Sequence, residues 1–183
     1  FFALSPPTRL RLRDETLTGT LAALTSGQAD LALGVVAEGT NVGGIHHDTL
    51  GPVGFVFAVA PSHPLAQQPE PIAQAELVKY RAVAVGDTSR NFKPLTFGLQ
   101  AGQEVLTVPN LHQKIQAQVA GLGCGWVPVH FARREIESGQ LIVKSIENDD
   151  RQGDLCAAWH RGHQGQALHW WTQFLSGIQL NFL

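Results

Sequence analysis

The stretch LTSGQADLALG, residues 24–34, decides the fold, because an apolar helical repeat ends within it and a strand begins. Leu21 and Leu24 continue a helical stripe, and Gly27 follows as a residue type that ends helices. The apolar run 30–36 is too short for a helix and suits a strand buried on both faces. The stretch therefore predicts a helix, a tight turn and a buried strand in succession.

Upstream of this stretch, apolar and basic residues alternate. Leu10 and Leu12 are interleaved with Arg9, Arg11 and Arg13, a period of two that predicts a strand with one buried face. With the helix and strand that follow, this segment would complete a βαβ unit. The three arginines could bind an anion or a partner, although such a row is more often the solvated face of a sheet.

Downstream, apolar runs with strand and helix periods take turns to the end of the chain. We expect strands at 45–50, 54–60, 82–85, 104–108, 125–127, 141–143 and 155–159, and helices at 73–80, 111–122, 131–138 and 168–178. Asn110 suits the N-cap of the second of these helices. This alternation predicts an α/β architecture with mostly parallel sheets and right-handed crossovers.

Composition bounds the class of protein. The 183 residues are 44% hydrophobic and 15% charged, enough for one ordinary domain or two small lobes and unlike a disordered chain. A net charge of −2 argues against a wide face that binds nucleic acid phosphates. We expect neither a membrane span nor a signal peptide, which favours a cytoplasmic protein. Since methionine is absent, the sequence is expected to begin inside a longer gene product.

The motifs of enzymes and metal sites find little support. Residues 121–125 are rich in glycine, but a helix precedes them and a strand follows, the reverse of a dinucleotide-binding loop, so a helix cap is the better interpretation. The pairs at 46–47 and 160–163 offer histidines without further ligands, and Cys124 and Cys156 lie in apolar runs. No hydrolase elbow, P-loop or zinc-protease motif is present. We therefore expect no metal, no cofactor and no enzyme.

The polar loop 86–92 is the most informative candidate site, because it follows an apolar strand, where open α/β sheets place ligands. Thr88, Ser89 and Asn91 are uncharged hydrogen-bonding residues. Together with the helix N-terminus at Asn110, whose free backbone N–H groups favour an anion, they could hold a small molecule bearing a carboxylate. A solvated turn explains these residues equally well.

Three landmarks in order carry a resemblance to a known family: LTSGQADLALG at 24–34, HPLA at 63–66 and AGLGCGWVP at 120–128. They resemble the recurrent landmarks of the effector-binding domain of LysR-type transcriptional regulators. Each is modestly specific by itself, whereas the three in this order, spread across nearly the whole chain, are fairly specific.

The resemblance implies a fold like that of type 2 periplasmic binding proteins, with two Rossmann-like lobes, a hinge crossed twice and an effector in the cleft. Lobe I would comprise residues 1–58 and 160–183, and lobe II residues 59–159. The cleft would be lined by residues that match the family pattern, namely Thr16, Thr18, Thr88, Ser89, Asn91, Phe92 and Asn110.

The chain departs from the family pattern at its start. Family domains open with a strand, a Ser/Thr-bearing loop and a helix, so we expect one cleft wall, a central strand and the N-terminal winged helix-turn-helix to be missing from this sequence. The remaining domain would bind a small effector, associate as a homodimer or homotetramer and contact DNA only through the missing domain.

The expected mechanism is an effector that biases lobe closure and subunit arrangement, with no bond made or broken. The alternative is a solute-binding protein of the same fold, which a secretion signal upstream would favour and an upstream helix-turn-helix would exclude. A second rival, an α/β enzyme, would be favoured by turnover of a bound metabolite.

Overall fold

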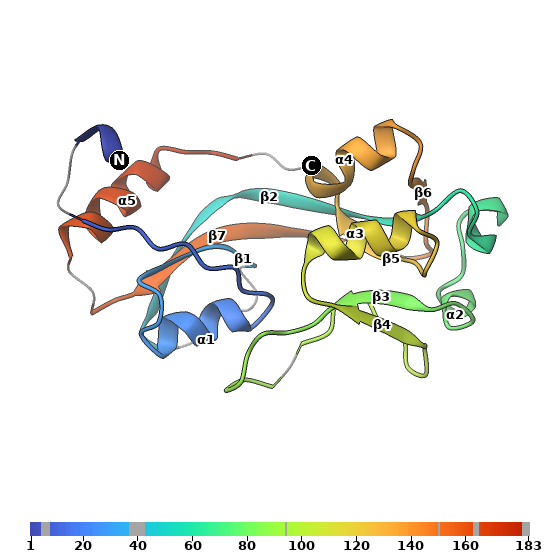
Figure 1. The fold of residues 1–183 in the computed structure, drawn as a ribbon, viewed down its shortest axis with the longest axis horizontal. Helices are drawn as coiled ribbons and strands as arrows, with labels where there is room; N and C mark the ends of the chain where they lie inside the picture. Colours follow the sequence, from blue (N-terminus) through green and yellow to red (C-terminus); the bar gives the residue numbers. More distant parts are fainter. Residues whose placement is uncertain (5–7, 37–42, 94, 150, 163–164, 181–183) are drawn as a thin grey trace.

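In a computed structural model, residues 1–4, 8–36, 43–93, 95–149, 151–162 and 165–180 are described. Helices and strands are interspersed along them (Figure 1). In order, the elements are η1 (Phe2–Leu4), α1 (Gly19–Thr25), β1 (Leu31–Val36), β2 (Ile45–Val59), η3 (Pro64–Gln67), α2 (Gln74–Leu77), β3 (Ala82–Val85), β4 (Val105–Val108), α3 (Leu111–Val119), β5 (Gly125–Pro128), α4 (Val129–Glu137), β6 (Ile142–Lys144), β7 (Gln152–His160) and α5 (Gln166–Ser176).

The strand β2 runs through both halves of the molecule (Figure 1). Its first part, 45–54, pairs with β7, and its last part, 55–59, pairs with β5 and β6. The larger sheet has the order β1-β7-β2-β5, with β6 also on β2, and β3 and β4 form a second sheet. The chain returns to the first half just before β7, where the Phe55 N–H donates to the Arg151 carbonyl at 3.0 Å, so two chain passes connect the halves.

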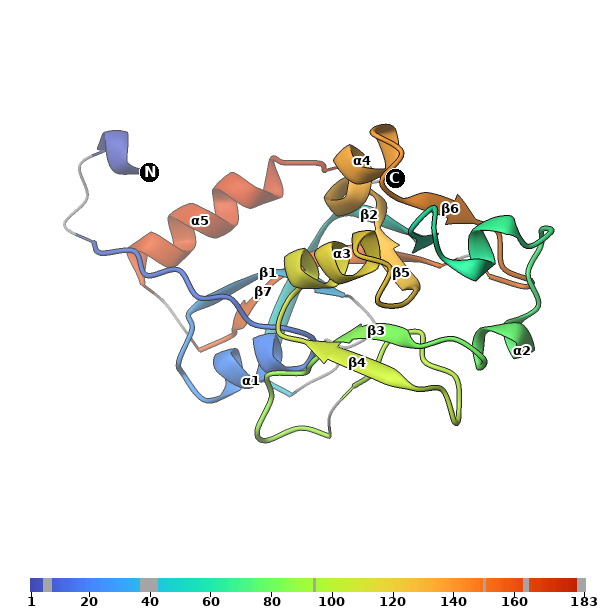
Figure 2. The ribbon, with the colours of Figure 1, turned by 45° about the vertical axis from the view of Figure 1, so that its right-hand side comes forward.

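The two halves have separate cores. In the first lobe, α1 covers one face of β1 and β7 around Leu24, and α5 packs on the opposite face around Leu175 (Figure 2). In the second lobe, α3 and α4 cover one sheet face around Ile115, whereas η3 and α2 cover the other around Leu77. The fold is therefore a mixed α/β fold of two lobes.

The expectation of mostly parallel sheets is wrong. Every strand pair of the larger sheet is antiparallel, and within the described ranges β3 and β4 are the one pair of named strands that runs parallel. Most helices and strands were predicted near their observed positions, but apolar periodicity carries no information about the direction in which a partner strand runs.

The expected strand at residues 9–13 is also absent. The segment forms neither a strand nor a helix, and Leu12 is 94% exposed. Alternation makes a strand only where a partner strand and a face to bury are available, and here neither is found among the described residues. The predicted βαβ unit therefore does not form, although α1, the turn at Gly27 with φ of +69° and β1 are confirmed.

The two extended segments predicted around residues 45–60 are one continuous strand. The pairing register between β2 and β7 shifts between Thr49 and Gly51, and Gly51 has a φ of +149°. A β-bulge therefore replaces the predicted break. A Cβ at Gly51 would lie 1.7 Å from the carbonyl oxygen of Leu180, and the Leu180 N–H donates to the carbonyl of Leu50 at 2.8 Å. Glycine at position 51 thus allows the segment after α5 to approach β2.

In β1, Ala32 and Val35 are buried, whereas Leu33 is 54% exposed, so this strand is not buried on both faces as its sequence predicts. Within the ranges that the structure describes, none of the helices has the length and apolar character that a membrane crossing requires.

Candidate functional site

Loop 86–92 begins where β3 ends, as the sequence predicts, and its first residue is fixed to the neighbouring strand. The Gly86 N–H donates to the carbonyl oxygen of Val108, the last residue of β4, at 2.9 Å. The loop therefore starts at the carboxyl end of the β3–β4 sheet, the edge at which α/β proteins commonly place ligands.

Two threonines from the segment before α1 meet this loop, although about seventy positions separate them in the sequence. The Thr16 hydroxyl donates to the Gly86 carbonyl at 2.5 Å, and the Thr16 N–H donates to Oγ1 of Thr88 at 3.0 Å. The Thr18 hydroxyl donates to Oδ2 of Asp87 at 2.7 Å. The structure thus joins Thr16, Thr18 and Thr88 across the two lobes.

Asp87 lies at the centre of these contacts, and sequence reasoning missed it. Its carboxylate accepts from the Thr18 hydroxyl, from the Thr18 N–H at 3.3 Å, from the Ser89 N–H at 2.8 Å and from the Leu95 N–H at 2.9 Å. Burial raises the pKa of Asp87, but these hydrogen bonds outweigh it, so the pKa lies below its ordinary value and the group is ionised at neutral pH.

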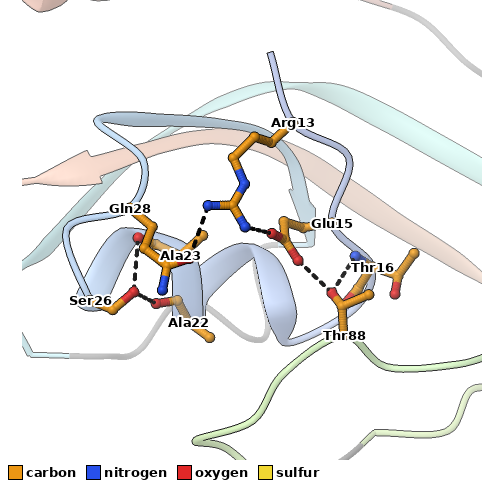
Figure 3. Close-up of polar contacts among 8 residues, drawn as sticks. All are labelled: Arg13, Glu15, Thr16, Ala22, Ala23, Ser26, Gln28 and Thr88. Carbon is orange, nitrogen blue, oxygen red and sulfur yellow. Dashed lines mark hydrogen bonds and ion pairs between the residues drawn. The ribbon is translucent and has the colours of Figure 1, made fainter. Parts of the chain in front are cut away.

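Glu15 extends the network toward the end of α1 (Figure 3). Its Oε2 accepts from the Thr88 hydroxyl at 2.7 Å, and its Oε1 pairs with Nη2 of Arg13 at 2.7 Å. Nη1 of Arg13 in turn donates to Oε1 of Gln28 at 2.9 Å. Arg13 thus pairs with residues of the first lobe, Glu15 and Gln28, whereas its alternation with leucine left open either a site for an anion or partner or the solvated face of a sheet. We call Glu15, Thr16, Thr18, Gly86, Asp87 and Thr88 the interlobe contact.

Close approach of the lobes explains a glycine at the start of α1. A Cβ at Gly19 would lie 1.9 Å from Oγ1 of Thr88 and 3.2 Å from Oε2 of Glu15. Gly19 is buried, so any larger residue there would have to push the Thr88 side chain aside. The sequence offers no signal for this role, because it depends on a residue of the other lobe.

The remaining predicted residues play other parts in this structure. The Ser89 hydroxyl accepts from the backbone N–H of Phe92 at 2.9 Å and that of Asn91 at 3.3 Å, which shapes the loop. Phe92 packs against the core of the first lobe. Asn110 caps α3, as predicted, by accepting from the Gln113 N–H at 2.9 Å. Asn91 and Asn110 are exposed, and no hydrogen bond among the described residues joins their side chains to the interlobe contact.

The chain that continues from the loop packs against the start of β7. A Cβ at Gly98 would lie 2.6 Å from the Trp126 ring, and the Arg151 guanidinium lies 4.1 Å from the centre of that ring and 5.2 Å from the Phe97 ring. Asp149 accepts from both Trp126 and Arg151. The far end of the loop region is therefore fixed beside one of the two chain passes that connect the lobes.

The described residues offer little for metal or nucleophilic chemistry. No group of three or more potential metal ligands occurs among them. Cys124 and Cys156 are free and buried, and burial raises the pKa of the Cys124 thiol to about 12, which leaves it protonated. His63 accepts from the Leu65 N–H at 3.2 Å, and burial lowers its pKa, so it caps η3 as a neutral side chain.

Two α/β lobes connected by two chain passes, with a polar contact between them at a strand-end loop, define the type 2 periplasmic-binding-protein class of fold. The family model "LysR substrate binding domain" matches residues 1–177, so the chain belongs to this family.

The curated relatives are transcriptional regulators. The chain is 35% identical over 171 residues to the uncharacterized HTH-type transcriptional regulator YeeY of Escherichia coli K12, covering 93% of this chain and 55% of that protein. It is 35% identical over 163 residues to the probable HTH-type transcriptional regulator YhaJ of the same organism, covering 89% and 54%. The chain thus spans about half the length of these relatives.

Solved structures support the fold. The probable transcriptional regulator PA0477 from Pseudomonas aeruginosa matches with a TM-score of 0.70 at 22% identity, over 94% of this chain and 57% of that one. The effector-binding domain of QuiR in complex with shikimate matches with a TM-score of 0.63 at 18% identity, over 87% and 78%. Full-length LysG from Corynebacterium glutamicum with bound effector Arg matches with a TM-score of 0.61 at 20% identity, over 93% and 59%.

Proposed function

We propose that this chain is the ligand-sensing domain of a LysR-type DNA-binding transcription factor and binds a small, carboxylate-bearing effector between its two lobes. The interlobe contact is the observation that carries this proposal. Hydroxyl and N–H donors from segments far apart in sequence converge on one carboxylate there, that of Asp87. Hydroxyl and N–H groups that together bind one carboxylate are also the donors that the carboxylate of a ligand needs.

The effector residues in this proposal are those suggested by the family pattern: Thr16, Thr18, Thr88, Ser89, Asn91, Phe92 and Asn110. The hydrogen bonds of the three threonines support their assignment, because each lies where one lobe meets the other. Ser89 and Phe92 would shape the loop, and the exposed amides of Asn91 and Asn110 would turn to an incoming ligand.

The lobes in this proposal comprise residues 1–58 with 160–183, and residues 59–159. The change of partner within β2, from β7 up to Gly54 to β5 from Phe55 on, supports a crossing a few residues earlier than position 58. The Phe55 N–H donates to the Arg151 carbonyl at 3.0 Å, which supports a second crossing just before β7, several residues earlier than position 160. The strand β7 then lies with β1 and α5 in the first lobe.

An effector would act by differential affinity for two arrangements of the lobes, which moves subunits in a homo-oligomer and the DNA-binding domains attached to them. No reaction is required, in agreement with relatives that are regulators. The DNA contact would come from a winged helix-turn-helix domain, and the protein would act in the cytoplasm. The transport-type alternative has less support, because the curated relatives regulate transcription.

A thermal-shift screen of small carboxylic acids tests the proposal. We expect a carboxylate effector to raise the melting temperature of the wild type, and Asn91→Ala to reduce that shift without changing the unliganded protein, because Asn91 is exposed. Ser89→Ala should also reduce it by loosening the loop. Gln116→Ala, an exposed change on α3, serves as the matched control. Equal stabilisation of all four proteins by a hit would place the site elsewhere.

A further inference from the structure

We infer that Asp87 is an internal ligand: its carboxylate occupies the position of the effector carboxylate and holds the lobes together until an effector displaces it. This inference rests on the proposed function and adds to it a competitor built into the chain.

The hydrogen bonds of Asp87 connect three separate backbone segments. Two come from Thr18 in the first lobe, at 2.7 and 3.3 Å, and two come from the backbone N–H groups of Ser89 and Leu95 in the second lobe. The contact with Ser89 is a local turn, but the contact with Thr18 joins positions that lie 69 residues apart. A local turn would not need the donors of the first lobe.

The same donors cannot serve two carboxylates at once. Each N–H and O–H here donates to Asp87, and a hydrogen-bond donor satisfies one acceptor well. A second carboxylate beside Asp87 would also bring like charges together, because these hydrogen bonds keep Asp87 ionised at neutral pH. An effector carboxylate that uses these donors must therefore release Asp87 from Thr18, which breaks one of the connections between the lobes.

The other hydrogen bonds of the interlobe contact do not involve Asp87. Release of this one side chain would therefore remove only part of the contact between the lobes. Thr16 keeps its bond to the Gly86 carbonyl, and Thr88 keeps its bond to Glu15. Displacement of Asp87 would therefore loosen the loop without separating the lobes. The effector would replace an intramolecular bridge between lobes with its own.

Chemical rescue tests this inference without knowledge of the effector. Asp87→Ala leaves four donors facing a space of carboxylate size, and added acetate should fill it. We expect acetate to raise the urea unfolding midpoint of Asp87→Ala and to bind it at least about tenfold more tightly than it binds the wild type, as expected for charge-assisted hydrogen bonds. Acetamide, which has the same shape and no charge, should have little effect, and chloride balances ionic strength.

Two further variants make the outcome decisive. Asp87→Asn keeps the space filled, so acetate should affect it no more than the wild type. Asp14→Ala removes an exposed carboxylate close in sequence to the interlobe contact, and acetate should affect this variant no more than the wild type. If acetate acts equally on Asp87→Ala and Asp14→Ala, or leaves Asp87→Ala unfolded while Asp87→Asn folds, the inference is wrong.

The two hypotheses fail separately. If rescue is absent but the screen finds an effector whose binding depends on Asn91, the proposed function stands and Asp87 is only a structural residue. If rescue occurs but Asn91→Ala reduces stabilisation by none of the carboxylic acids in the screen, the donors around Asp87 do bind a carboxylate. The proposed effector class or effector residues are then wrong.

Discussion

Lys114 has an unusual position for a charged residue. It is 4% exposed, and its Nζ lies 3.5 Å from where a Cβ on Gly125 would be, an ordinary contact distance. Burial lowers the pKa of Lys114 from 10.5 to about 8. The charged form is therefore held at a cost inside the second lobe.

This cost predicts a pH-dependent effect of Lys114→Met. The folded protein releases the Lys114 proton near pH 8 and the unfolded chain near pH 10.5, so below pH 8 the penalty is fully present, and the free energy of unfolding of the wild type rises between these values by about 3 kcal/mol. Methionine has a similar shape and no charge, so the variant should be more stable than the wild type at pH 7, by at most about that amount.

Urea unfolding between pH 7 and pH 10.5 measures this difference. The advantage of Lys114→Met should shrink as the pH rises and be nearly lost at the top of the range. Lys93→Met, a change at an exposed lysine, should show no such trend. A stability difference that stays constant across the range would contradict the assignment of the cost to the charge.

At the scale of single residues, the sequence revealed caps but not long-range contacts. The role of Asn110 as a cap was predictable, because its hydrogen bond is to its own helix, three residues on. Asp87 and Glu15 were missed, since their partners Thr18 and Thr88 belong to the opposite lobe. No local pattern can reveal a role that is created by tertiary structure.

At the scale of elements, Gly51 in the bulge of β2 is the position most sensitive to a small change. Gly51→Ala would combine a positive φ with a contact of 1.7 Å to the Leu180 carbonyl oxygen. Gly27→Ala shares the positive φ but meets nothing within 4 Å, so it should cost only about 1 kcal/mol.

The predicted result is a loss of unfolding free energy for Gly51→Ala that exceeds the loss for Gly27→Ala by at least about 1 kcal/mol. Urea unfolding of both variants beside the wild type gives this comparison. Similar losses in the two variants would mean that the segment at Leu180 moves away freely and that its contact with β2 contributes little to stability.

The sequence predicted most elements well and their pairing poorly. Periodicity located α3, β3 and β5 within a few residues, because each has a clear apolar side and a definite stop. It divided β2 into two, since a Gly-Pro pair at 51–52 resembles a break, whereas the bulge absorbs it. The strand predicted at residues 9–13 does not form for the opposite reason, because the alternation is present but no partner strand is found among the described residues.

At the scale of the whole molecule, the interlobe contact predicts coupling between positions 19 and 88. Gly19→Ala should destabilise the protein by roughly 1–3 kcal/mol through the clash with Oγ1 of Thr88, although alanine ordinarily favours a helix over glycine. Thr88→Ala removes that oxygen and its hydrogen bonds. The double variant should therefore be more stable than the sum of the two single effects predicts, by about 1 kcal/mol or more.

Unfolding of the four proteins of this double-mutant cycle measures the coupling. If the changes in unfolding free energy of Gly19→Ala and Thr88→Ala simply add in the double variant, the two lobes do not approach each other at this point in solution. Gly139→Ala, which meets nothing within 4 Å and lies after α4 in the second lobe, should be additive with Thr88→Ala and so provides the control.

The strand β2 changes its pairing partner between Gly54 and Phe55 without ending, so one continuous backbone belongs to both lobes. Any swing of one lobe against the other must be taken up as torsion in this strand and in its neighbour near Arg151, where Phe55 is hydrogen-bonded. A rotation of one lobe against the other would therefore have to twist these two hydrogen-bonded strands together, unlike a rotation about a flexible linker.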